Sequence, residues 1–73
     1  MSVFHFHLRS GSMVFEDRRG VELPTIADAV RHGEHDARHL LLDNPQMDRG
    51  SHWIEIADKT GNVIRTVPFT LIH

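Results

Sequence analysis

The chain has 73 residues, of which 40% are hydrophobic and 25% charged, and its formal net charge is −2 with neutral histidines. This length predicts one domain over residues 1–73. The weak negative charge argues against a nucleic-acid partner. The absence of cysteine excludes disulfides and thiolate chemistry. No apolar run reaches the roughly 18 residues of a membrane span, and residues 1–12 lack a signal-peptide core, so we expect a cytoplasmic protein without a membrane partner.

An N-terminal β-hairpin is predicted over residues 3–16. Apolar and polar residues alternate over residues 3–9, which is typical of a half-buried strand. The apolar residues on its inner face are Phe4, Phe6 and Leu8. A Ser-Gly-Ser turn follows, and residues 13–16 return to an extended form. Residues 17–20 make a second turn, and residues 21–24 form an extended lead-in because the residue before a proline avoids the α region.

A helix is predicted to begin after Thr25 and to end at Asn44 and Pro45. Thr25 is the expected N-cap, and Asp28 at the third helical position completes an approximate capping box. Apolar and small residues then recur at spacings of three and four, which favours one buried stripe. The stripe consists of Ile26, Ala29, Val30, Gly33, Ala37, Leu40 and Leu41. Because glycine costs about 1 kcal/mol relative to alanine inside a helix, we expect Gly33 to mark a close approach to the sheet.

A second β-hairpin is predicted over residues 52–69, where β-branched and aromatic residues are frequent. Asp58 to Gly61 fits a type I turn followed by a left-handed glycine, and pairing of Asp58 with Asn62 would set the register. The expected cross-strand partners are Ile56 with Ile64, Glu55 with Arg65, Ile54 with Thr66, and Trp53 with Val67. Both faces then carry apolar groups: Ile54, Ile56 and Ile64 on one, and Trp53, Ala57, Val63, Val67 and Phe69 on the other.

The expected architecture is an α+β fold of the ββαββ type, in which two β-hairpins form one mainly antiparallel four-stranded sheet and a single helix packs on one face. One helix covers one face, so the apolar groups on the second face predict contact with another chain, first of all a homodimer formed through the sheet. The interface residues expected there are Trp53, Val63, Val67 and Phe69. For Trp53, packing against the helix is the alternative to a role as an interface anchor.

Several motifs resemble those of one known family. An aromatic-rich strand is followed by Asp17-x-x-Gly20-Val21-Glu22-Leu23-Pro24, an alanine-containing helix, Trp53-x-Glu55-Ile56-x-Asp58-x-x-Gly61-x-Val63, and a closing Val67-Pro68-Phe69. Over nearly the whole chain, this pattern resembles a family of small proteins of unknown function found in rhizobia and related alphaproteobacteria. The resemblance implies a short stand-alone cytoplasmic protein and no established activity or catalytic residue. Typical members carry fewer histidines on the helix.

Seven histidines in 73 residues are several times the usual share. The strongest chemical candidate is a metal site on one helical face, because imidazoles spaced three and four apart, with a carboxylate one turn earlier, can bind Zn²⁺, Ni²⁺ or Cu²⁺. The candidate ligands are Asp28, His32, His35 and His39. This face lies opposite the apolar stripe and is expected to meet solvent or a partner. The alternative is a polar helix face, since a straight helix places such side chains along a line and a complete site needs a ligand from elsewhere.

The histidine content also predicts a response to mild acid. Imidazole titrates near pH 6.5, so the net charge moves from −2 towards +5 if all seven histidines ionise. His5 and His7 share one strand face, where a metal-binding pair and a solvated face are the two alternatives.

No enzyme class is indicated. Ser51 and His52 are neighbours on an extended strand and point apart, so they make no nucleophile–base pair, and the glycines are scattered rather than gathered in a phosphate-binding loop. We expect a non-catalytic protein-interaction module without a cofactor, homodimeric through its sheet. The alternative is a metal- or pH-responsive binding protein that uses the helix histidines. A nucleic-acid accessory protein is the third candidate, with Arg9, Arg18, Arg19 and Arg31 as its contacts.

Overall fold

The computed structural model describes residues 1–48 and 51–69 as one helix packed against an open, mainly antiparallel sheet of five strands, which confirms the α+β class. In chain order the elements are β1 (Ser2–Ser10), β2 (Met13–Phe15), β3 (Val21–Leu23), α1 (Ile26–Asp43), the 3₁₀ helix η1 (Pro45–Asp48), β4 (His52–Asp58) and β5 (Val63–Pro68). Neither helix in this part of the chain combines the length and the apolar character that a membrane crossing needs.

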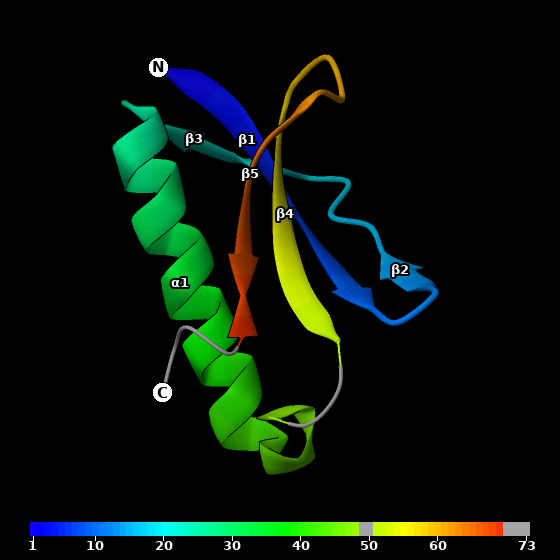
Figure 1. Ribbon diagram of the computed structural model, residues 1–73. Coiled ribbons are helices and arrows are strands. Elements are labelled where there is room, and N and C mark those ends of the chain that lie inside the picture. Colours follow the sequence, from blue (N-terminus) through cyan, green and yellow to red (C-terminus); the bar gives the residue numbers. More distant parts are fainter. Residues whose placement is uncertain (49–50, 70–73) are drawn as a thin grey trace.

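The sheet has the order β2-β1-β4-β5, and β3 pairs with β1 on the same edge as β2. The long strand β1 therefore lies at the centre, and every pairing between described strands is antiparallel. Figure 1 shows α1 running beside β5 and β4, whereas β2 lies at the opposite side of the molecule. The helix also contacts β3, and Val21 and Leu23 of that strand pack against the core, so β2 is the strand that the helix leaves exposed.

The fifth strand corrects the prediction of a four-stranded sheet. The residues from Val21 to Leu23 were expected as an extended lead-in, and they form β3, which pairs with Ser2–Phe4 of β1. An extended backbone before Pro24 carries free N–H and C=O groups, and pairing with β1 gives them partners. The polar loop expected after Pro45 begins as η1, and residues 49–50 of that loop lie outside the described part of the chain.

The ends of α1 match the prediction because side chains next to each end satisfy the backbone there. The Thr25 hydroxyl accepts a hydrogen bond from the Asp28 N–H at 3.1 Å and donates one to the Asp28 carboxylate at 2.8 Å. At the other end, the N–H of Asn44 and its side-chain amide both donate to the Leu40 carbonyl, at 2.9 and 3.1 Å. An N-cap such as Thr25 typically stabilises a helix by about 1 kcal/mol.

Three small residues on α1 make the contact with the sheet. Ala29, Gly33 and Ala37 are all buried. A Cβ atom added at Gly33 would lie 3.1 Å from Ile56 Cδ1 and 3.4 Å from Val67 Cγ2, which confirms Gly33 as a close approach. The core below this stripe is a cluster of Phe4, Phe6, Ala29, Ala37, Ile54, Ile56, Val67 and Phe69.

The register of the second hairpin differs from the prediction beyond its turn. The turn forms as expected: the Asp58 N–H donates to the Asn62 carbonyl at 2.9 Å, and Gly61 has a φ of 92°. A β-bulge between Ile56 and Ala57 then shifts the pairing, so Ile56 lies opposite Arg65. The other observed partners are Trp53 with Pro68, Ile54 with Val67, Glu55 with Thr66, and Ala57 with Val63.

The bulge changes which side chains face the helix. Directly opposed residues of an antiparallel pair point to the same face, and a one-residue shift moves a strand's side chains to the other face. Val67, expected on the outer face, is 5% exposed in the core, and Phe69 is 2% exposed beside it. The predicted contact of Glu55 with Arg65 is also wrong, because Glu55 instead pairs with Arg9 of β1 at 3.7 Å.

Candidate functional site

A gap in the strand pairing along β1 is filled by the side chain of Asp17. On the edge of β1 that faces away from β4, β3 covers Ser2–Phe4 and β2 covers Leu8–Ser10. Between them, Asp17 Oδ2 accepts a hydrogen bond from the Phe6 N–H at 3.1 Å. The carboxylate therefore acts as a short substitute for a paired strand.

The same carboxylate closes its own loop. Asp17 Oδ1 accepts hydrogen bonds from the N–H groups of Arg19 and Gly20, both at 3.1 Å. Gly20 has a φ of 75°, and a Cβ atom there would lie 2.7 Å from Val3 Cγ1, so this loop position requires glycine. Burial raises the pKa of Asp17, but the N–H donors of Phe6, Gly20 and Arg19 outweigh burial and hold the pKa below its ordinary value.

Two histidines of β1 bind the backbone of Asp17. His5 Nδ1 lies 2.9 Å from the Asp17 carbonyl and must carry the proton, because a carbonyl only accepts. His7 Nδ1 accepts from the Asp17 N–H at 3.0 Å and must be unprotonated there. The two rings stack, with centroids 6.1 Å apart and an angle of 7° between their planes. His5 and His7 therefore hold the loop at Asp17 on the outer face of the sheet. Nδ1 is the donor in His5 and the acceptor in His7.

The four candidate metal ligands on α1 are dispersed among other partners. Asp28 accepts from Thr25 and Arg31. The ring of His32 packs on Phe6, with centroids 4.5 Å apart. His32 therefore faces β1, although it was expected to face solvent or a partner. His32 also lies 3.4 Å from the Asp36 carboxylate. His35 and His39 contact each other, with ring centroids 4.3 Å apart. Among residues 1–48 and 51–69, no three His, Cys, Asp or Glu side chains converge on a point that could hold a metal ion.

The four expected interface residues fall into three different environments. Val67 and Phe69 belong to the core under α1, which corrects their placement on an outer face. Trp53 lies on the outer face and not against the helix: its ring centroid is 5.8 Å from the Arg9 guanidinium carbon, and its indole N–H donates to Glu55 at 3.3 Å. Val63 is 51% exposed near the β4–β5 turn. Of the four predicted interface residues, Trp53 and Val63 are therefore accessible to a partner, whereas Val67 and Phe69 are not.

An open groove of about 420 Å³ lies between the second half of α1 and the β1–β2 hairpin. Its floor is apolar, and its rim carries four carboxylates and one imidazole. We call the apolar lining residues the floor, namely Phe6, Leu8, Phe15, Leu40 and Ile54, and the polar lining residues the rim, namely Glu16, Asp17, Asp36, His39 and Asp43. An apolar floor with a few convergent polar groups is the usual make-up of a protein binding site.

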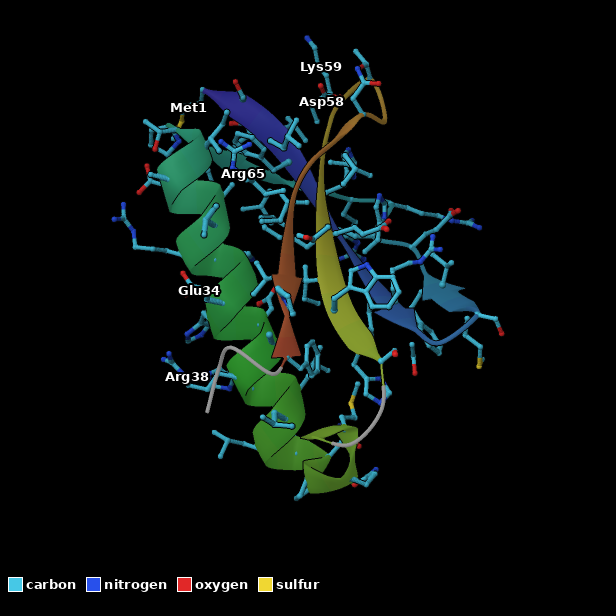
Figure 2. All side chains as sticks on the ribbon, viewed as in Figure 1. Met1, Glu34, Arg38, Asp58, Lys59 and Arg65 are labelled. Carbon is cyan, nitrogen blue, oxygen red and sulfur yellow. The ribbon has the colours of Figure 1, made fainter. Side chains whose placement is uncertain are left out.

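The rim carries four carboxylates, and its basic counterparts can be sought only among residues 1–48 and 51–69. No lysine or arginine of the described residues lines the groove. Figure 2 shows Arg38 on the side of α1 that faces away from β2 and Lys59 at the tip of the β4–β5 turn. Asp43 is the last residue of α1, where the helix dipole is negative, and the last turn holds no basic residue. The carboxylates on both sides of the groove therefore favour a cationic group between them.

Sequence reasoning missed this groove, although one signal for it was present. His32, Asp36, His39 and Asp43 recur at spacings of three and four, which places them along one flank of the helix. The pattern was interpreted as a metal site of Asp28, His32, His35 and His39, and the carboxylates of Asp36 and Asp43 were left out. Asp17 was also missed as a structural residue, although its position three residues before Gly20 is typical of a side-chain-closed turn.

Comparison with known proteins gives one match. The model of a domain of unknown function, DUF6894, matches residues 3–70. Searches of curated proteins and of solved structures give no match. The family match confirms that the chain carries a domain of unknown function, as the resemblance implied.

Proposed function

This chain belongs to the family defined by the domain of unknown function DUF6894, and we propose that it is a small, non-catalytic, cytoplasmic interaction module that binds a second copy of itself through its sheet. The surface that supports the proposal is the free edge of β2. Met13, Val14 and Phe15 are 59%, 43% and 52% exposed. In the described sheet, β2 pairs on one side only, with β1. Exposed apolar residues on an unpaired strand edge are a template for pairing with another chain.

The opposite edge of the sheet supports this choice by contrast. The edge strand β5 contains a bulge at Ile64, a charged Arg65 and Pro68, which lacks an N–H group. Bulges, charges and prolines on an edge strand are the usual means of preventing pairing with another chain. Strand β2 has none of the three, and only its length of three residues limits pairing, so a symmetric pairing of two copies is expected at β2 rather than at β5.

The proposed interface replaces the one expected from the sequence. Val67 and Phe69 are committed to the monomer core, and Trp53 is partly covered by Arg9. Self-association through the sheet therefore no longer needs an apolar outer face. It depends on the three apolar residues of β2.

Light scattering of the full chain after size exclusion tests this function. We expect a dimer mass at about 100 µM, an ordinary range for a weak self-association. Val14→Lys places a charge on the free edge and should give the monomer mass, whereas Val63→Lys is the matched control and should leave the dimer intact. A monomeric wild-type protein, or a dimer that only Val63→Lys disrupts, would contradict the proposal.

A proton-responsive role is the second candidate, and the His7–Asp17 hydrogen bond favours it. Protonation of an imidazole places a proton on both ring nitrogens, so the Asp17 N–H would lose its acceptor on His7. The charged and titratable groups around His7 are the Asp17 carboxylate, the stacked His5 ring, Glu55 opposite it on β4, and Arg9. Release of the loop at residues 17–20 would loosen the connection between β2 and β3.

The corresponding test is sedimentation between about pH 7 and pH 5.5, the range in which histidine changes charge. We expect the association of the wild-type protein to change over this range and that of His7→Gln, which keeps a neutral acceptor, to stay constant. His35→Gln on the exposed face of α1 is the control and should behave as the wild-type protein. A constant wild-type profile would rule out this role.

A further inference from the structure

The groove between α1 and β2 is an apolar surface that the chain leaves open. On its floor, Phe15 is 52% exposed, whereas Ile54 is 2% exposed. Phe6 is only 8% exposed, since the ring of His32 packs on it. Asp36, His39 and Asp43 border the groove on the α1 side, and they leave Leu8, Phe15 and Leu40 partly open to solvent. Exposed apolar surface of this kind, rimmed by polar residues, commonly marks a site of interaction.

The charge around the groove selects the kind of partner. Glu16 and Asp17 lie on the sheet side, and Asp36 and Asp43 lie on the helix side. The donors of Phe6, Gly20 and Arg19 hold the carboxylate of Asp17 in its charged form. The negative end of the α1 dipole adds to the same field. Negative potential from both walls favours a cationic group between them.

A second copy of this chain is a poor occupant of the groove. In a two-fold symmetric contact, the same patch meets itself, so the carboxylates of one rim would face those of the other. Like charges placed opposite each other across an interface cost free energy. The proposed edge contact of β2 differs from the groove in charge, because Met13, Val14 and Phe15 carry none. The two surfaces share Phe15, so the rim carboxylates are the residues that belong to the groove alone.

We propose that this groove binds a cationic amphipathic peptide segment of a different protein, with an apolar side chain on the floor and lysine or arginine side chains at the rim. This inference deepens the proposed function, since it names the chemistry of a partner for an interaction module. Asp36 and Asp43 are seven residues apart, which is about 10 Å along α1. Three residues of an extended segment bridge that span, so two basic side chains of one short segment can reach both carboxylates.

A labelled peptide in which a Leu-Phe pair is flanked on each side by two lysines is the probe. We expect saturable binding to the wild-type protein by fluorescence anisotropy, and weaker binding as sodium chloride is added, because rim charges are screened. A peptide with glutamate in place of each lysine should not bind, and a peptide with serine in place of Leu-Phe should bind weakly. Equal binding of the lysine and glutamate peptides would overturn the proposal.

Protein variants locate the site. The double variant Asp36→Asn/Asp43→Asn should bind the lysine peptide about threefold to tenfold more weakly, as expected for two exposed charge pairs. Glu22→Gln/Glu34→Gln removes the same number of charges elsewhere and should bind as the wild-type protein; Figure 2 shows Glu34 on the side of α1 away from β2. Phe15→Ser should weaken binding while it leaves all charges in place. Wild-type affinity in the double variant would overturn the proposal.

Light scattering of the same samples separates this inference from the proposed self-association. The double aspartate variant should keep the dimer mass, because neither carboxylate lies on β2. A dimer that fails to bind the lysine peptide would overturn the groove proposal alone. A monomer that binds the peptide would overturn the self-association alone.

Discussion

The two halves of the sheet's helix-facing surface are built alike but covered differently. Under α1, Ile54 and Ile56 of β4 are 2% and 0% exposed. Toward the other edge, on the same face, Phe15 of β2 is 52% exposed. The core therefore ends where the helix contact ends, and not where the strands cease to be apolar.

The reason lies in the side chains of α1. Ala29, Gly33 and Ala37 let the helix come close to β4 and β5, and a close contact between small residues is also a narrow one. On one flank, Val30 and Leu41 extend the contact and pack against the core. On the other flank, the positions nearest β1 and β2 carry carboxylates and imidazoles, so the contact stops there and the groove begins.

The largest expected difference between the two halves is in core stability. Ile56→Ala should lower the free energy of unfolding by about 2–5 kcal/mol, because it removes methyl groups from a closed core. Phe15→Ala should lower it by only about 1 kcal/mol, since half of that side chain already contacts water. Urea denaturation of the two variants measures both changes. Where Ile56→Ala does not fold, Ile56→Val provides the same comparison at about 1 kcal/mol.

Equal losses for Ile56→Ala and Phe15→Ala would contradict this comparison. They would mean that β2 belongs to the core as fully as β4 does. In that case the groove would be closed in solution.

The second prediction concerns the loop that joins the two halves. Asp17→Asn should lower the free energy of unfolding by about 2 kcal/mol near neutral pH, since it removes the charge from a carboxylate that accepts three backbone N–H groups. The pKa of Asp17 is lower in the folded protein than its ordinary value. The stability from this charge is therefore fully present above the ordinary pKa and is lost as the pH falls through the folded-state pKa.

Thermal unfolding as a function of pH measures this effect. The difference between the wild-type protein and Asp17→Asn should be constant near neutral pH and should shrink below about pH 4, where free aspartate titrates. Asp36→Asn is the control and should show no such pH-dependent gap, because its carboxylate has no backbone donor among the described hydrogen bonds. A gap that widens in acid would contradict the role assigned to Asp17.

Local chemistry explains the part of the fold that the sequence predicts. The ends of α1 follow from Thr25 and Asn44, and the close approach at Gly33 follows from a glycine in the middle of an apolar stripe. The Asp58–Gly61 turn is equally local. At the helix ends and in the turn, the residues that make the structure lie within four positions of one another, so the sequence alone carries the information. Gly33 meets distant residues, Ile56 and Val67, but its place in an apolar stripe is visible in the sequence.

The missed features depend on contacts between distant segments. Strand β3 is three residues long and exists because β1 offers it a partner. The bulge at Ile64 places Val67 opposite Ile54 and on the side of the helix. No glycine or other turn residue at this position predicts the bulge. The flank histidines and carboxylates were visible as a pattern, but the side of the sheet that they border depends on the strand order β2-β1-β4-β5. The placement of Val67 and Phe69 on an outer face was wrong for the same reason, because the faces were counted without the bulge.

The smallest expected effect is also the one that separates function from stability. Asp43 places a negative charge at the negative end of α1, and no basic residue in the last turn offsets it. Asp43→Asn should therefore raise the free energy of unfolding by about 0.3–0.5 kcal/mol, although the same substitution removes a rim charge that the cationic segment requires. Urea denaturation at low ionic strength detects the gain, and added salt should abolish it.

Asp28→Asn, at the positive end of the same helix and bonded to Thr25, should change stability in the opposite direction. A loss of stability in Asp43→Asn would mean that Asp43 supports the fold, and the excess negative charge of the groove would then have a structural explanation instead of a functional one.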